Sequence, residues 1–261
     1  MASQIRASVA YVAISLVSVA LVSSFGQAVW AGPLEDGKAA HLRKDYQAAM
    51  ALLRPLADQG NPVAQCEVGQ LYEEGMGGEK HWDMDSAFPW FQKAADQGNV
   101  QAQTFLGFYY LNKGQGFGAM ADQPSHDGVY QPTAAQSQAL AESLKWFHKA
   151  GNLGDARALW RIGRAYEDGL GGADGLGAAY AADSPHYSYN ELRLLSKFGV
   201  PRDYVQAYKW YSLAADSGNN SVARQRDALA AKLTPSQLSE GKRQAAQWRA
   251  HHPKPIWSEA C

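Results

Sequence analysis

Histidines, cysteines and glycine-rich stretches are the residues of this chain that could carry chemistry. No two of the seven histidines stand four apart around a glutamate, the spacing of a helical zinc site. His148 falls within a helical pattern, and His251 and His252 fall in a proline-rich tail. The chain has no Gly-x-Ser-x-Gly elbow, and its glycine-rich run at 75–78 follows a helical pattern instead of opening a helix, as a phosphate loop would. We expect no catalytic residue, no metal and no cofactor.

Arginines and aromatic residues at helical spacing are stronger candidates, for binding. Three arginines occur at i, i+4 and i+7, a spacing that places them on one helix face. Two earlier segments present Gln101, Phe105 and Phe108, and Val63, Glu67 and Gln70, in the same way. The predicted partner-binding residues are Gln101, Phe105, Phe108, Arg157, Trp160, Arg161 and Arg164. Guanidinium groups beside aromatic rings suit a peptide that bears carboxylates and an apolar anchor.

Arg157, Arg161 and Arg164 form what we call the arginine stripe, and a simpler interpretation of it stays open. Charged residues on a helix face are most often solvated, and nearby acids such as Asp168, Asp174 or Asp183 could pair with these arginines.

The elements that would position these residues are revealed by a repeat. Four glycines are equivalent: Gly60, Gly98, Gly154 and Gly218. Nine residues after the first three come Gly69, Gly107 and Gly163, and three residues later Tyr72, Tyr110 and Tyr166. Eight and seven residues before each turn glycine stand Leu52-Leu53, Trp90-Phe91, Trp146-Phe147 and Trp210-Tyr211. Fixed offsets of this kind indicate repeated helical hairpins joined at the glycines.

The glycine inside the first helix of each unit needs a physical reason, because glycine costs about 1 kcal/mol relative to alanine there. We expect close helix–helix approach, with an aromatic ring of a neighbouring helix filling the space above each glycine. Neither helix of a hairpin can bury its apolar face alone, so the units must stack.

The spacing of the turn glycines predicts the domain organisation. It is 38 residues once and longer twice, which places insertions between the two helices of the later units. The predicted boundaries are a signal peptide at 1–31, a leading hairpin at 32–60, a repeat at 61–98, a repeat at 99–154 with an insertion at 114–132, a repeat at 155–218 with an insertion at 169–201, capping helices at 219–250 and a tail at 251–261. The insertions carry aromatic residues and are second candidates for recognition; the alternative is a glycine-rich connection.

The repeat resembles the SEL-one-like repeat (SLR), a relative of the tetratricopeptide repeat. The resemblance lies in Ala-Gln-x-x-x-Gly-x-Leu-Tyr-x-x-Gly followed by Asp-x-x-x-Ala-x-x-Trp-Phe-x-Lys-Ala-Ala-x-Gln-Gly, which 64–98 matches almost throughout. It implies an all-α, α/α superhelical solenoid of about four hairpins with C-terminal capping helices. Such proteins mostly act as adaptors and scaffolds, and many are exported by bacteria. Some cysteine-rich members are described as penicillin-binding or β-lactamase proteins, but this chain lacks their cysteine pairs within each unit.

The first residues have the form of a secretory signal peptide. Arg6 precedes an apolar run without acids, and Val29-Trp30-Ala31 is an acceptable cleavage site. Cleavage after Ala28 and an uncleaved membrane anchor are the alternatives. Loss of Arg6 leaves 23 basic and 25 acidic residues, a net charge of −2. That balance provides no electrostatic argument for a nucleic acid or a membrane surface as partner.

Cys66 and Cys261 are the two cysteines. In an extended repeat stack they lie near opposite ends and could meet only if the tail folded back. We expect a semi-buried thiol and a loose tail, with a disulfide as the alternative.

The function we expect is that of a periplasmic or secreted scaffold. It would bind another protein or a peptide, acidic in character, in a concave groove lined by the first helices, without catalysis and without a stable membrane span. The alternative is a cell-envelope hydrolase acting on peptidoglycan or β-lactams. The sequence does not separate a periplasmic regulator from a released factor that contacts a host.

Overall fold

The computed structural model describes residues 32–74, 83–114, 134–168, 202–257 and 261. Over these residues the regular secondary structure is helical, with one isolated parallel bridge between Asp155 and Ile256. The helices are α2 (Pro33–Leu42), α3 (Tyr46–Asp58), α4 (Pro62–Glu73), α5 (Met84–Asp96), α6 (Val100–Gly114), α7 (Ala134–Asn152), α8 (Ala156–Asp168), α10 (Tyr204–Ala215), α11 (Asn220–Ala230) and α12 (Pro235–Arg249). The signal-peptide region and the insertion at 169–201 lie outside the described residues, as does the insertion at 114–132 except for Gly114, which is the last residue of α6.

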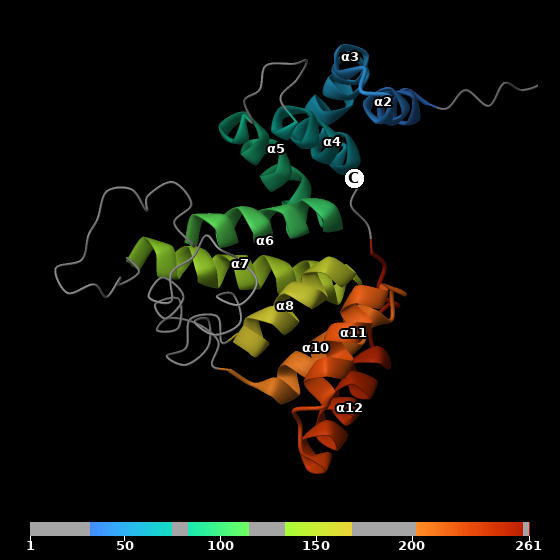
Figure 1. Ribbon diagram of the computed structural model, residues 1–261. Coiled ribbons are helices and arrows are strands. Elements are labelled where there is room, and N and C mark those ends of the chain that lie inside the picture. The colour runs from blue at the N-terminus through green and yellow to red at the C-terminus, as the bar shows by residue number, and fades with distance from the viewer. Residues whose placement is uncertain (1–31, 75–82, 115–133, 169–201, 258–260) are drawn as a thin grey trace, which may run out of the picture.

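The helices stack in chain order as antiparallel pairs (Figure 1). From α2 to α11 each helix packs against the next, so that α2 with α3, α4 with α5, α6 with α7 and α8 with α10 form successive layers. Helices α11 and α12 both pack on α10 and close the stack. The all-α solenoid with capping helices is therefore confirmed. A capping box begins α12: the Thr234 side chain accepts from the Gln237 amide, and the Gln237 side chain accepts from the Thr234 amide.

The joints between pairs repeat one hydrogen-bonding scheme. Each turn glycine has a positive φ, between 88° and 94°, which glycine adopts without a steric penalty. At the first joint the Gly60 amide donates to the Ala57 carbonyl, and the Asn61 amide donates to the Leu56 carbonyl. The Asn61 side chain then accepts from the first amides of α4. Backbone groups at the end of one helix and at the start of the next are thus both hydrogen-bonded by two consecutive residues.

The glycines inside the first helices meet aromatic rings, as the repeat predicts. A Cβ atom added at Gly107 would lie 2.5 Å from the Phe147 ring, and one at Gly163 would lie 2.6 Å from the Tyr211 ring. At Gly69 the nearest Phe91 atoms would be 3.0 Å away. The rings belong to the second helix of each pair and are buried. Glycine therefore sets how closely the two helices of a pair approach.

Candidate functional site

A cavity of about 750 Å³ opens on the side of the stack that carries the first helices α4, α6 and α8. Its lining residues are Gln70, Glu73, Glu74, Met84, Phe91, Gln101, Thr104, Phe105, Phe108, Tyr109, Asn112, Lys113, Arg157 and Cys261. Helix α6 contributes most of the lining, α4 and α5 contribute further residues, and Arg157 of α8 and Cys261, which is bonded to Cys66 of α4, complete it. The apolar part of the lining is largely aromatic, which suits contact with apolar side chains of a ligand.

Four of the seven residues predicted to bind a partner line this cavity: Gln101, Phe105, Phe108 and Arg157. Phe105 stacks on Phe91 with ring centroids 3.6 Å apart. Phe108 meets Phe147 edge to face at 5.2 Å. These aromatic contacts hold the two phenylalanines in place while their outer edges remain part of the cavity wall. Tyr109 also lines the cavity.

The other three predicted residues, Trp160, Arg161 and Arg164, follow along α8 and are not part of that lining. The Arg161 guanidinium lies 4.6 Å from the centroid of Phe108 and 4.6 Å from that of Trp160, in cation–π geometry. The Trp160 indole N–H donates to the Gln225 side chain at 2.7 Å. Arg161 thus connects the lining residue Phe108 to Trp160, and Trp160 connects α8 to the capping helix α11.

Two of the arginines pair with acids of their own helix region. Arg164 forms an ion pair with Asp168 at 2.9 Å, and Arg157 lies 3.7 Å from Asp155. The Asp168 pairing is one that the simpler interpretation of the stripe names. Asp174 and Asp183 lie outside the described residues. The positive charge that α8 presents is therefore partly neutralised before any partner arrives.

Acidic residues also line the cavity, although the helical spacing did not predict them there. Glu73 and Glu74 stand at the C-terminal end of α4. Burial raises the pKa of the Glu73 carboxyl, and the neighbouring charge of Glu74 raises it further. The cavity thus presents carboxylates on α4 together with Lys113 of α6 and Arg157 of α8, a lining of mixed charge.

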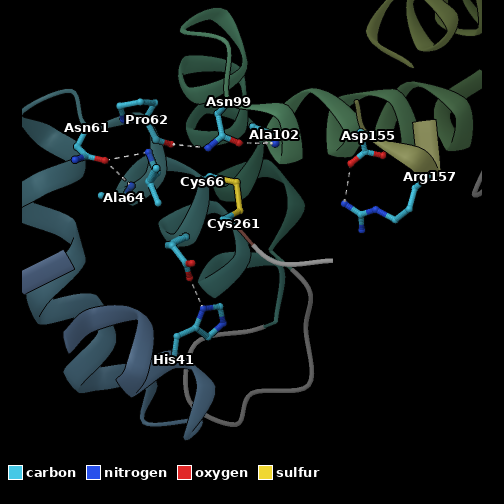
Figure 2. Close-up of a disulfide and its surroundings, with 12 residues drawn as sticks. His41, Asn61, Pro62, Ala64, Cys66, Asn99, Ala102, Asp155, Arg157 and Cys261 are labelled. Carbon is cyan, nitrogen blue, oxygen red and sulfur yellow. Dashed lines mark hydrogen bonds and ion pairs between the residues drawn. A yellow bond between two sulfur atoms is a disulfide. The ribbon is translucent and has the colours of Figure 1, made fainter. Parts of the chain in front are cut away.

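Asp155 is the buried acid beside the cavity. Its side chain is 1% exposed and accepts a hydrogen bond from the Ala158 amide at 2.8 Å, so it caps α8. Burial raises the pKa of the Asp155 carboxyl, while the Ala158 amide, Arg157 and the Thr104 hydroxyl oppose that rise. Asp155 therefore positions both the start of α8 and the guanidinium of Arg157 (Figure 2).

The expectation of a loose tail and a semi-buried thiol is wrong. Cys66 of α4 and Cys261 form a disulfide with Cα atoms 5.8 Å apart (Figure 2). The chain turns back after α12 and places Ile256 beside Asp155, and Figure 1 shows the C-terminal end beside α4. Distance along the stack misled the prediction, since the tail crosses the side of the stack from α8 to α4. Cys66 is fully buried, whereas Cys261 is partly exposed and lines the cavity.

A protein-family model matches this repeated architecture. The model of the Sel1 repeat matches residues 30–61, 62–99, 100–123, 137–155, 156–174 and 192–219, together more than half of the chain. The chain belongs to the Sel1 repeat family. Sel1 repeat proteins typically act as scaffolds for protein–protein interaction, and the coarse expectation of a binding scaffold agrees with that.

Solved structures of Sel1 repeat proteins resemble the chain. A Sel1 repeat protein from Oxalobacter formigenes is 26% identical, with a TM-score of 0.41, over 67% of this chain and 95% of that chain. The c5321 protein, a protective antigen of uropathogenic Escherichia coli strains with an SLR fold, is 21% identical. Its TM-score is 0.26, over 78% of this chain and 49% of that chain. No curated protein matches the chain significantly.

Glu67, one of the residues predicted to lie on the exposed helix faces, has a structural role in this Sel1 repeat protein. Glu67 is 3% exposed, and its carboxylate lies 2.7 Å from Nδ1 of His41 on α2. The other ring nitrogen of His41 lies 3.4 Å from Glu74. Hydrogen bonding to Glu67 raises the pKa of His41 against the opposing effect of burial. Glu67 thus ties the leading hairpin to α4, which helical spacing alone does not reveal.

The described part of the Sel1 repeat chain shows neither a membrane-spanning helix nor a cluster of metal ligands. There, no helix is both long and apolar enough to cross a bilayer. Within the same residues, no group of three or more His, Cys, Asp and Glu side chains could hold a metal ion.

Proposed function

We propose that this Sel1 repeat protein is an exported scaffold that binds a peptide segment of another protein in the cavity between α4, α6 and α8. The observation that carries the proposal is the cavity itself, because its aromatic wall remains open although the flanking rings are fixed by neighbours. An aromatic-lined recess bordered by charged groups of both signs is the type of surface on which a few anchor residues supply most of the binding energy.

The partner that fits is a peptide with an apolar anchor and charges of both signs. Phe105 and Phe108 would contact the anchor. Arg157 and Lys113 suit carboxylates of the peptide, while Glu73 and Glu74 suit its basic groups. A purely acidic peptide, as the arginine stripe alone suggests, would meet repulsion from the acids of α4.

Photo-crosslinking in the native cell tests this binding site. A photoreactive phenylalanine analogue replaces Asn112, an exposed residue of the cavity wall, and in a matched control it replaces Lys145, an exposed residue of α7 outside the lining. We expect a discrete crosslinked partner from position 112 and not from position 145. Equal capture from both positions, or none from 112, would contradict the site.

The proposal that the protein is exported rests on the apolar leader and on the disulfide. Disulfides persist in oxidising compartments such as the bacterial periplasm and the extracellular space, and the Cys66–Cys261 pair is compatible with either. We expect the mature protein to begin at Gly32 and to fractionate with the periplasm or the medium. N-terminal sequencing of the protein recovered from cells checks this, and an intact Met1 would overturn it.

A further inference from the structure

The segment after α12 bonds to the repeats through its backbone. The Ile256 amide donates to the Gly154 carbonyl at 2.8 Å, and the Ala156 amide donates to the Ile256 carbonyl at 3.0 Å. These two bonds make the parallel bridge between Ile256 and Asp155. The tail is thus held by its backbone at the joint before α8.

The joint before α8 differs from the three equivalent joints in this respect. A Cβ atom added at Gly154 would lie 3.4 Å from the Lys254 carbonyl and from the Pro253 ring. At Gly60, Gly98 and Gly218 no atom lies within 4 Å of the same position. The repeat leaves this surface open wherever the tail does not reach it.

The groups that hold the tail would serve any extended chain. Ala156 is the first residue of α8, and its amide belongs to the first turn, where helix amides have no partner within the helix. Here the Ile256 carbonyl is that partner. Backbone pairing of this kind gives affinity without reading a sequence, and side chains then add selectivity.

Besides the Pro253 ring at Gly154, two further side chains of the tail are covered. Pro255 is buried, and Trp257 packs beside Trp160 with ring centroids 6.4 Å apart. The Ile256 side chain points away and is 68% exposed. The contact surface therefore suits an extended peptide with proline and an aromatic residue two positions apart.

We propose that residues 253–257 occupy a second peptide-binding site of this protein as a resident ligand, and that the Cys66–Cys261 disulfide retains them there. Opening the disulfide releases the tail and makes the joint before α8 available to an extended peptide of another protein. This proposal deepens the proposed function and rests on it, since Arg157, which lines the cavity, directly follows Ala156, whose amide bonds to the tail.

A dithiol reductant performs the opening by thiol–disulfide exchange. One thiolate attacks Sγ of Cys261, which is the more exposed sulfur, and forms a mixed disulfide while Cys66 leaves as a thiolate. The second thiol of the reductant then closes on the first and releases the Cys261 thiolate. The reductant ends as a disulfide, and the protons of its two thiols end on the two cysteines.

Competition by the tail's own sequence tests the proposal on the full chain. The probe is a fluorescent, C-terminally amidated peptide with the sequence of residues 251–257, followed by fluorescence anisotropy. The release variant combines Cys261→Ser with Ile256→Pro, which removes the bonded amide. The matched control combines Cys261→Ser with Ile256→Ala, which keeps that amide and changes only an exposed side chain.

We expect the release variant to bind the probe at least about tenfold more tightly than the oxidised parent, with the control between them. A probe in which the residue equivalent to Ile256 is proline should lose binding. Equal binding by the oxidised parent and the release variant, or no binding by a release variant whose circular dichroism matches the parent, would overturn the proposal. Crosslinking from Asn112 reports the cavity separately, so that failure of the tail site and failure of the proposed function are distinguishable.

Discussion

Single glycines determine the distance between the paired helices of this protein. A Cβ at position 107 would enter the ring of Phe147, a buried side chain that is itself packed edge to face against Phe108. The fixed offset between glycine and aromatic residue made this contact predictable from the sequence, because both members recur in three units. Alanine would favour the helix by about 1 kcal/mol at an open position, so steric overlap must exceed that gain to lower stability.

Gly107→Ala is therefore expected to destabilise the protein by about 1–3 kcal/mol, the usual cost of overpacking a core. Urea unfolding followed by circular dichroism measures the loss. Gly69→Ala is the matched comparison, since its closest ring atoms would be 3.0 Å away, and it should cost less. Adding Phe147→Leu should recover part of the Gly107→Ala loss, and an unchanged double variant would argue against steric overlap.

The His41–Glu67 pair makes stability depend on pH. The pKa of His41 in the folded protein lies above its ordinary value of 6.5, because Glu67 accepts its hydrogen bond. The stabilisation is therefore complete below the unfolded-state pKa and is lost as pH rises through the folded-state pKa. Relative to His41→Gln, the parent should be more stable at about pH 6 than at about pH 9, as denaturant unfolding at both values can measure. His251→Gln, at an exposed position outside this pair, is the control for the substitution itself.

At the scale of the helix, Asp155 tests whether the cap or the charge matters more for α8. Equivalent joints use Asn61, Asn99 and Asn219, whose side chains accept from the first amides of the following helices. Asp155→Asn should therefore retain the cap, while Asp155→Ala should cost about 1 kcal/mol or more and leave Arg157 without its acid. Thermal unfolding of both variants measures this. An asparagine variant as unstable as the alanine variant would assign the effect to the ion pair.

Helices and their pairing could be predicted because the relevant information is local and repeated. The glycine, the capping side chain and the aromatic residue fall within one unit, and each unit presents them again. The place of Gln101, Phe105 and Phe108 in the cavity wall could be predicted in the same way, because these residues occupy one face of α6. Glu73 and Glu74 were missed because their place in the cavity lining depends on where α4 ends relative to α6 of the next unit. That relation between neighbouring units has no fixed sequence spacing.

At the scale of the whole molecule, the tail connects repeats that are not neighbours in the stack. Repeats in a solenoid normally contact only their neighbours, yet the tail bonds to the joint before α8 and ends on α4. No periodic signal encodes this crossing, because it depends on the path of the stack between α4 and α8. Two cysteines without a repeated spacing therefore could not reveal their pairing.

Closing this ring should couple the stability of distant repeats. The disulfide joins residues 195 apart in sequence, and a crosslink over so long a loop restricts the unfolded chain strongly. We expect reduction to lower the free energy of unfolding by about 2–4 kcal/mol, with Cys66→Ser/Cys261→Ser matching the reduced parent. Hydrogen exchange should locate the change: α4 and α5 should lose protection on reduction, while α10 and α12, which pack on each other directly, should retain it. Uniform loss across all helices would mean that the disulfide stabilises the chain as a whole without coupling its ends.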